Sequence, residues 1–166
     1  MILTEPAIQA KFGRKLRMRV LTAFLAEAAA AVRLHGDVSV LLTTDVEIRR
    51  LNRTFRHKDK ATDVLSFPAE GPGGVAGDLA ISVETAERQA AEAGHALSVE
   101  CRVLLLHGVL HLAGYDHEAD TGQMARRETT LRKRFGLSAG LIERSGEKQI
   151  TRTTKKTTKT GRSAGR

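Results

Sequence analysis

Apolar residues recur along the chain with two different periods, and these periods predict its helices and strands. A repeat of three to four residues is typical of one face of a helix, and it occurs in five segments. These expected helices cover about 17–34, a short segment after Asp45, 84–94, about 98–113 and about 121–135. Runs rich in leucine and β-branched residues predict strands at Val38–Thr43, Val64–Phe67 and Leu79–Val83. Helices and strands that do not strictly alternate favour an α+β domain.

Local signals mark where several of these elements begin and end. Gly36-Asp37 is expected to end the first helix, because glycine and aspartate favour turns. A segment rich in glycine and proline, Glu70–Gly77, is expected to form the turn between two strands. Asp45 and Ser98 have side chains that can cap a helix, so we expect them at the starts of the helices that follow them.

The distribution of charge separates a domain from the end of the chain. The net charge is +8, and residues 145–166 contribute +6 of it. This basic tail has a single large apolar residue, Ile150, so it is expected to be disordered. It would serve either as a basic arm for RNA or another polyanion, or as a solubilising tail. Residues 1–144 are then expected to form one domain of nearly balanced charge.

Composition argues against several classes of protein. Aromatic residues make up 4% of the chain, which disfavours a module that stacks bases on aromatic platforms. The lone cysteine, Cys101, lies in an apolar helical stretch and is expected to be a buried thiol. No apolar run approaches the roughly 18–20 residues of a membrane helix, and residues 1–10 lack the apolar core of a secretion signal. A cytoplasmic protein that does not act on a membrane is expected.

Three of the six histidines fall in the segment 107–117, which is the main candidate site. His107 and His111 are four residues apart, so they lie on one face of the expected helix. Gly114 can end that helix with a positive φ, after which the chain can bring His117 back to the pair. Three imidazoles with one open position are typical of catalytic zinc, which lowers the pKa of a bound water to about 7. The pattern predicts one Zn²⁺ per chain; histidines packed under a turn are the alternative.

The same spacing matches the zinc-binding helix of metzincin proteases, with one difference. The general-base glutamate of those proteases follows their first histidine, and here that position is Gly108. The site therefore lacks the usual proton acceptor for peptide hydrolysis. Asp116 and Glu118 flank His117, and each is either an outer hydrogen-bond partner of a ligand or a surface carboxylate.

Polar and basic residues between Asn52 and Pro68 form a second candidate site. Arg56 is suited to bidentate contact with phosphate, and beside a metal it could stabilise charge that develops on a phosphodiester. The alternative is that Arg56 and its neighbouring lysines form a solvated loop. Asp78, at the start of the next strand, either binds substrate or caps a turn.

With these motifs the chain resembles the bacterial YbeY endoribonucleases, which are ribosomal RNA maturation factors. The resemblance covers roughly residues 37–135. It rests on three blocks, Asp45–Pro68 with its Phe55-Arg56 pair, Gly77–Ser82 and His107–His117, and Met124 and Glu128 also fit.

The resemblance implies a compact α+β fold, with a small mixed sheet of about four strands packed with four to five helices. It implies a zinc-dependent endoribonuclease that is specific for single-stranded RNA. Such an enzyme would act in maturation of the 3′ end of 16S ribosomal RNA and in ribosome quality control. Arg56 and His107 would be catalytic, Arg56 and Asp78 would contact the RNA, and His107, His111 and His117 would bind the metal. Further partners would be ribosomal proteins or a ribosome-associated GTPase.

Two other functions stay open from the sequence. One is a non-catalytic ribosome-assembly factor with a structural zinc, in which a protein side chain would close the fourth coordination position. The other is a minimal metalloprotease, whose hydrolysis of casein would depend on His107.

Overall fold

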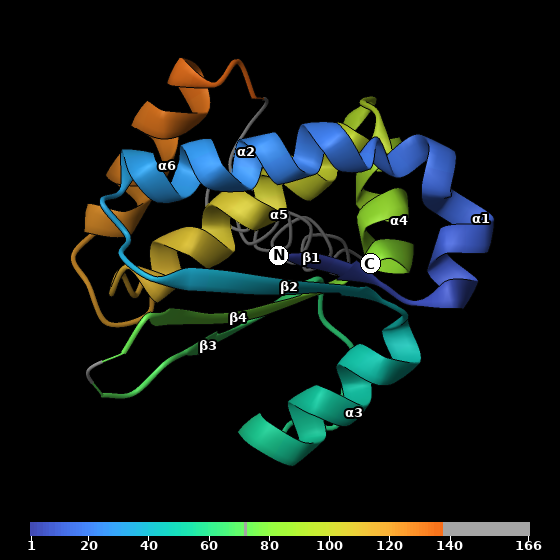
Figure 1. Cartoon of the computed structure of the whole chain (residues 1–166), viewed down its shortest axis with the longest axis horizontal. Helices are drawn as coiled ribbons and strands as arrows, with labels where there is room; N and C mark the ends of the chain where they lie inside the picture. The colour runs from blue at the N-terminus through green and yellow to red at the C-terminus, as the bar shows by residue number, and fades with distance from the viewer. Residues whose placement is uncertain (72, 138–166) are drawn as a thin grey trace, which may run out of the picture.

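The computed structural model describes residues 1–71 and 73–137 (Figure 1). These residues form four strands and six helices. In chain order they are β1 (Ile2–Thr4), α1 (Pro6–Leu16), α2 (Met18–Ala31), β2 (Asp37–Thr43), α3 (Asp45–Arg56), β3 (Val64–Pro68), β4 (Val75–Ser82), α4 (Val83–Ala93), α5 (Leu97–Leu112) and α6 (Gln123–Arg134). The expected domain end at 144 and the expected disordered tail, 145–166, lie outside the described residues.

The strands form one mixed sheet in the order β1-β2-β4-β3. β1, β2 and β4 run parallel, with Val40 of β2 beside Leu79 of β4, whereas β3 runs antiparallel to β4. Parallel neighbours need long crossover connections, and α1 with α2 supplies the one between β1 and β2. The α+β class and the small mixed sheet are therefore confirmed.

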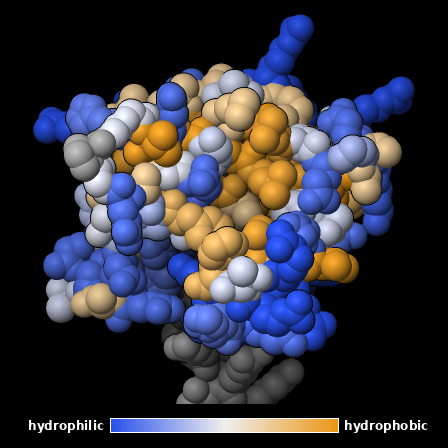
Figure 2. Space-filling view, turned by 60° about the horizontal axis from the view of Figure 1, so that its bottom comes forward, coloured by the Kyte–Doolittle hydropathy of each residue, from blue (hydrophilic) through white to orange (hydrophobic). Residues whose placement is uncertain are grey.

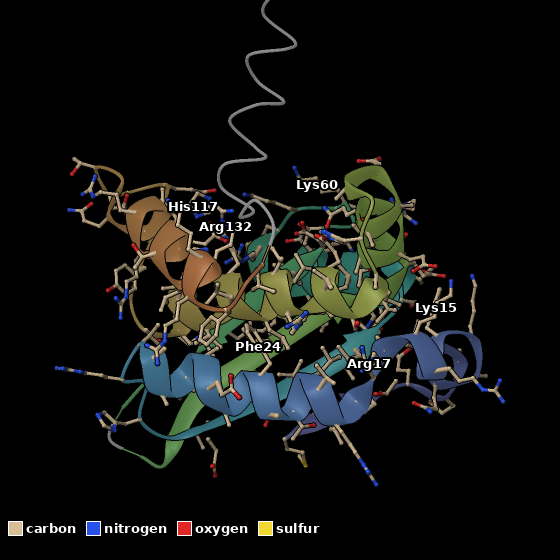
Figure 3. All side chains as sticks on the ribbon, turned by 90° about the horizontal axis from the view of Figure 1, so that it is seen from above. Lys15, Arg17, Phe24, Lys60, His117 and Arg132 are labelled. Carbon is tan, nitrogen blue, oxygen red and sulfur yellow. The ribbon has the colours of Figure 1, made fainter. Side chains whose placement is uncertain are left out.

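Most helices pack on one face of the sheet, and α3 packs on the other (Figure 1). α5 lies beside α2 (Figure 3), and it contacts the sheet, α2, α4 and α6. Buried residues lie on all sides of this mostly apolar helix, as expected for a helix that is packed all round. Cys101, which is fully buried in α5, is a core thiol as expected, and burial raises its pKa to about 12.

The face of the sheet that carries α3 is only partly covered. Ile48 of α3 packs with Leu65 and Ala80 in a small second core. Hydrophobic side chains remain visible on this side, with hydrophilic ones around them (Figure 2). Leu3 of β1 and Val75 of β4 are more than half exposed.

The start of the chain contains two elements that the sequence analysis did not predict. β1 joins the sheet edge, and α1 buries Ile8, Phe12 and Leu16, which are spaced four residues apart on one face. Between α1 and α2 the chain breaks at Arg17, which adopts a left-handed φ of 53°. Arginine carries no turn signal, so a single helix over 17–34 was expected where the structure begins α2 at Met18. The described residues consequently form six helices rather than four to five.

Three expected boundaries are wrong by a few residues. The N-cap of α3 is Thr44, not Asp45, and its hydroxyl accepts a hydrogen bond from the Glu47 amide at 3.3 Å. Ala96, not Ser98, precedes α5, because Ser98 is already inside the buried first turn of that helix. β4 begins at Val75, inside the expected turn. Val75 already pairs with Asp37 of β2, and a register shift then pairs Val38 with Gly77.

No single helix in the described ranges is long and apolar enough to cross a membrane. α4 and α5 reach the required length and composition only when they are taken together, and they are bent by 112° at their junction.

Candidate metal centre

Two of the three clustered histidines lie on one face of α5. His107 and His111 are one helical turn apart, and their Nε2 atoms are 3.2 Å from each other. His107 is only 5% exposed and lines a pocket, whereas His111 is half-buried. The rigid helix therefore holds two imidazole nitrogens toward a common point.

The turn after α5 brings the third histidine to the other two. α5 ends at Leu112, and Gly114 follows with a φ of 93°, which glycine adopts without steric cost. His117 then lies with its ring centroid 5.4 Å from that of His107 and 5.2 Å from that of His111. One nitrogen from each of the three rings lies within 4.8 Å of the others, so the expected histidine triad is assembled.

The geometry and chemistry of this triad fit a metal ion. Nitrogens that bind zinc at tetrahedral positions are about 3.3 Å apart, close to the observed distance between His107 and His111. Burial, together with the neighbouring His107 and His117, lowers the pKa of His111 to about 4. A histidine with this pKa is neutral at pH 7, the form that binds metals. Within the described residues no other His, Cys, Asp or Glu belongs to the group, which favours an open coordination position.

A buried carboxylate approaches the far side of the His107 ring. Oε1 of Glu128 lies 3.4 Å from Nδ1 of His107, which is an ion-pair distance and longer than a normal hydrogen bond. Glu128 is 1% exposed and lies on the buried face of α6 between Met124 and Leu131. Since Nε2 faces the other two histidines, Nδ1 can hold the ring proton and direct it toward Glu128. Histidines that bind a metal usually direct their other ring N–H to a carboxylate in this way.

Asp116 and Glu118, which flank His117 in the sequence, were candidates for this outer position. Asp116 instead accepts a hydrogen bond from the Glu118 amide within the exposed turn. One feature of the sequence could have identified Glu128. It lies on the apolar stripe of α6, where a buried acid needs a polar partner.

We expect Glu128→Ala to weaken metal affinity roughly 10- to 100-fold, because the His107 ring loses the group that orients it. Glu128→Gln keeps an acceptor of the same shape without the charge, so its affinity should lie between those of Glu128→Ala and the wild type. Competition with a coloured chelator measures the affinity, and melting curves in chelator show whether each variant is folded. Glu27→Ala, which removes an exposed acid from α2, is the matched control. Equal affinities for folded Glu128→Ala and wild type would contradict this role.

Two adjoining pockets open beside the triad. The first, of about 370 Å³, contains all three histidines, and the second, of about 610 Å³, contains His111 and His117. Both are also lined by Arg56, Lys58, Ser66 and Glu118, so they form one continuous groove, here called the histidine groove. Lys60, which lines the first pocket, and His117 both lie beyond α5 on the side away from α2 (Figure 3).

The end of α3 places its basic residues in the histidine groove. α3 terminates at Arg56 because His57 adopts a left-handed φ of 56°. The buried Asn52 donates a hydrogen bond from Nδ2 to the Lys60 carbonyl at 2.8 Å and so ties the following loop to the helix. The structure thus brings Arg56 and the lysines to the histidines, although about fifty residues separate them in the chain. The tethering role of Asn52 was missed, since an asparagine on a helix carries no such signal.

Asp78, the other expected substrate contact, is not brought to the same place. It is exposed on β4 opposite Phe67 of β3, and it lines neither pocket of the histidine groove. Its neighbour Leu79 faces the main core, so Asp78 faces the α3 side of the sheet. Its contact with substrate stays a prediction.

Gly108, which replaces the protease glutamate, faces the sheet. A Cβ atom at this position would lie 2.7 Å from Cδ2 of the buried Leu79 on β4. A side chain at this position would therefore require the buried Leu79 side chain to move. The glycine matches the close packing of α5 on β4.

Comparisons with known proteins agree with this site. The sequence profile described as endoribonuclease YbeY matches residues 4–136. A protein named endoribonuclease YbeY from Koribacter versatilis is 54% identical over 125 residues, which are 75% of this chain and 82% of that protein. A protein of the same name from Solibacter usitatus is 51% identical over 142 residues, which are 86% of each.

A solved structure shares the fold. The solution structure of a protein from Thermotoga maritima has a TM-score of 0.53 and 31% sequence identity, over 78% of this chain and 85% of that one. This shared fold, the profile match over most of the chain and the high identity to named relatives support the same assignment. The chain belongs to the endoribonuclease YbeY family.

Proposed function

We propose that the protein is a zinc-dependent endoribonuclease that cleaves single-stranded RNA within the histidine groove. The observation that carries this proposal is the placement of a metal-binding triad and of Arg56, Lys58 and Lys60 in the same pocket. Three cations beside a metal centre suit a polyanionic substrate, because each phosphate that binds can be neutralised there. The named relatives support the choice of RNA as the polymer.

The metal is proposed to be one Zn²⁺, held by His107, His111 and His117. Three imidazoles with an open position suit zinc in a catalytic role better than magnesium or calcium, which prefer oxygen ligands. When bound, the ion would act as a Lewis acid and lower the pKa of water at the open position. Glu128 would hold His107 in the orientation and tautomer that this requires.

Arg56 is proposed to bind the scissile phosphodiester. Its side chain lines both pockets of the histidine groove, so it can reach a phosphate beside the triad. A planar guanidinium can donate two parallel hydrogen bonds to phosphate oxygens and stabilise the charge that develops on them. The lysines would hold the neighbouring phosphates as point charges.

Depth of the site supports a preference for single strands. His107 is 5% exposed and lines the first pocket, so a strand has to bend into that pocket to bring a phosphodiester near this histidine. A flexible single strand can adopt such a bend, whereas a paired strand is held in a regular helix. The family resemblance supports the 3′ end of 16S ribosomal RNA as the physiological substrate. It also supports a cytoplasmic location, a role in ribosome quality control, and ribosomal proteins or a ribosome-associated GTPase as partners.

The two alternative functions find less support. A structural zinc needs a fourth protein ligand, and within the part of the chain that the structure describes the triad has none. A metalloprotease of the metzincin type needs a base at position 108, where this chain has a glycine packed against Leu79.

Arg56→Ala is expected to lower the rate of RNA cleavage about 100- to 1000-fold while the bound zinc stays unchanged. The loss follows because the arginine contacts the phosphodiester and not the metal. Cleavage of an end-labelled single strand, followed on a gel beside the same strand annealed to its complement, measures both rate and strand preference. Zinc content is measured on the same samples.

Two further variants make this experiment specific. Arg53→Ala removes an arginine of the same helix that lines neither pocket, and its cleavage rate should stay near that of the wild type. Arg56→Lys keeps the charge but loses the paired donors, so it should recover only part of the rate. Cleavage by Arg56→Ala at the wild-type rate would remove Arg56 from the proposed mechanism.

A further inference from the structure

An exposed phenylalanine lies at the edge of the histidine groove. Phe55, the residue before Arg56, is 62% exposed and lines the second pocket of the groove. Tyr115, the sole tyrosine of the chain, lines the same pocket from the turn after α5. The chain has only six aromatic residues, and the fold brings two of them to this one pocket. The low aromatic content had argued against base stacking, but the placement of these two residues argues for it locally.

The ring of Phe55 is held in place although most of its surface is open. It packs against Phe67 of β3 with ring centroids 5.4 Å apart and an interplanar angle of 68°, an edge-to-face contact. This contact restricts the ring without burying it, which leaves aromatic surface available to a ligand. A held ring loses little conformational entropy when it binds.

Position distinguishes Phe55 from the other large hydrophobic residues that are exposed. Within residues 1–71 and 73–137 these are Met1, Leu3, Val46 and Val75. None of them lines either pocket that contains the histidines. Phe55 alone of this exposed set therefore lies where a substrate of the metal centre would pass.

The groove combines the two features by which proteins bind single strands. Arg56 and Lys58 line it beside the histidines and can hold phosphates, while Phe55 and Tyr115 provide flat apolar surface next to them. A positively charged groove with adjacent aromatic rings binds the backbone through its charges and the bases by stacking. A ligand with both an anionic group and a planar ring matches this arrangement, and a nucleotide of an RNA strand has both.

We propose that the second pocket is a nucleobase subsite, in which a base beside the scissile phosphodiester stacks on Phe55 while Arg56 holds its phosphate. This inference rests on the proposed ribonuclease function. It adds a physical reason for strand preference, because a base can reach Phe55 only when it is neither paired nor stacked in a helix.

The test compares cleavage of two kinds of single-stranded RNA by the full-length protein. One strand is intact, and a series of others lacks one base each at successive positions around the cleaved bond. Phe55→Leu should lower kcat/KM on the intact strand about tenfold, since stacking on one aromatic ring contributes roughly that much. Phe55→Tyr should restore it. In the wild type, one abasic position should cause a similar loss, and in Phe55→Leu the same position should cause no further loss.

A second readout reports stacking directly. With 2-aminopurine at the position identified by the abasic series, the wild type should quench its fluorescence on binding, and Phe55→Leu should not. Val46→Ala, which removes an exposed hydrophobic residue of the same helix outside the groove, is the control and should behave as the wild type. Zinc content should be equal in all variants.

The outcomes separate this inference from the function on which it rests. A wild type that cleaves RNA, together with an unaffected Phe55→Leu and a flat abasic series, would overturn the base subsite and leave the ribonuclease function intact. A wild type that neither binds nor cleaves RNA would overturn both. A loss in Phe55→Leu that is uniform across the abasic series would also overturn the subsite, because it would show that no particular base is read by the ring.

Discussion

His107→Ala is expected to abolish zinc binding and RNA cleavage together. His107 is the most buried of the three histidines, its Nε2 lies 3.2 Å from that of His111, and Glu128 approaches its Nδ1. The substitution removes one of the three metal ligands, and it also removes the imidazole ring that Glu128 approaches. The loss of affinity should therefore exceed the roughly 10- to 100-fold that follows loss of an outer partner.

Zinc content of the purified protein and cleavage of a labelled single strand are the two measurements. Wild type and variant are prepared side by side, so that a contaminating ribonuclease would appear equally in both. His35→Ala, which changes an exposed histidine outside the groove, is the matched control and should keep full zinc and activity. Circular dichroism checks that the folded content is the same in all three proteins.

Each result has a distinct meaning. Loss of zinc and of cleavage in His107→Ala alone would establish a metal-dependent ribonuclease. Equal cleavage by His107→Ala and wild type would contradict the proposed function and favour an assembly factor in which the ion is structural or regulatory.

Gly77→Ala is expected to cause a large loss of stability although it adds only one methyl group. Gly77 adopts a φ of 147°, and a Cβ atom there would lie 2.5 Å from the Phe67 carbonyl oxygen and 2.7 Å from Cδ2 of Leu112. The first clash is with backbone of the paired strand, which cannot move without breaking the ladder between β3 and β4. Backbone strain and overpacking each cost about 1–3 kcal/mol, a large share of a total stability of about 5–15 kcal/mol.

Melting curves and urea titrations measure this loss, and the melting temperature should fall by roughly 5–20 °C. Gly74→Ala is the matched control, because it lies just before β4 and a Cβ atom there meets nothing within 4 Å. Zinc affinity should also fall in Gly77→Ala, since Leu112 directly follows His111 and a displaced helix end moves that ligand. A Gly77→Ala variant that melts with the wild type would show that β4 can shift without cost.

Packing at two glycines links the sheet to the chemistry of the site. Gly77 lets the end of α5 approach β4 at Leu112, and Gly108 lets the middle of the same helix approach Leu79. Both close approaches keep α5 flat against the sheet, which fixes where His107 and His111 point. Gly108 therefore has a packing role at a position where proteases with the same histidine spacing have a catalytic glutamate.

Local sequence determined the histidine triad and the kinds of element that carry it. His107 and His111 share a face through the helical period alone, and Gly114 permits the turn that returns His117, so no distant contact is needed to predict the cluster. The strands Val38–Thr43 and Val64–Phe67 could likewise be predicted, because their apolar composition is a local signal.

Tertiary structure alone decided which distant residues join that triad. Glu128 approaches His107 because α6 packs against α5, and Arg56 lines the same pocket as His107 because α3 packs beside β3. Asp78 was a candidate from its place at the start of a strand. It faces the α3 side of the sheet, because strand alternation and register place its neighbour Leu79 in the main core. Hydrophobic periodicity shows which face of a helix or strand is buried. It does not show which element packs against that face, because that depends on how whole helices and strands pack together.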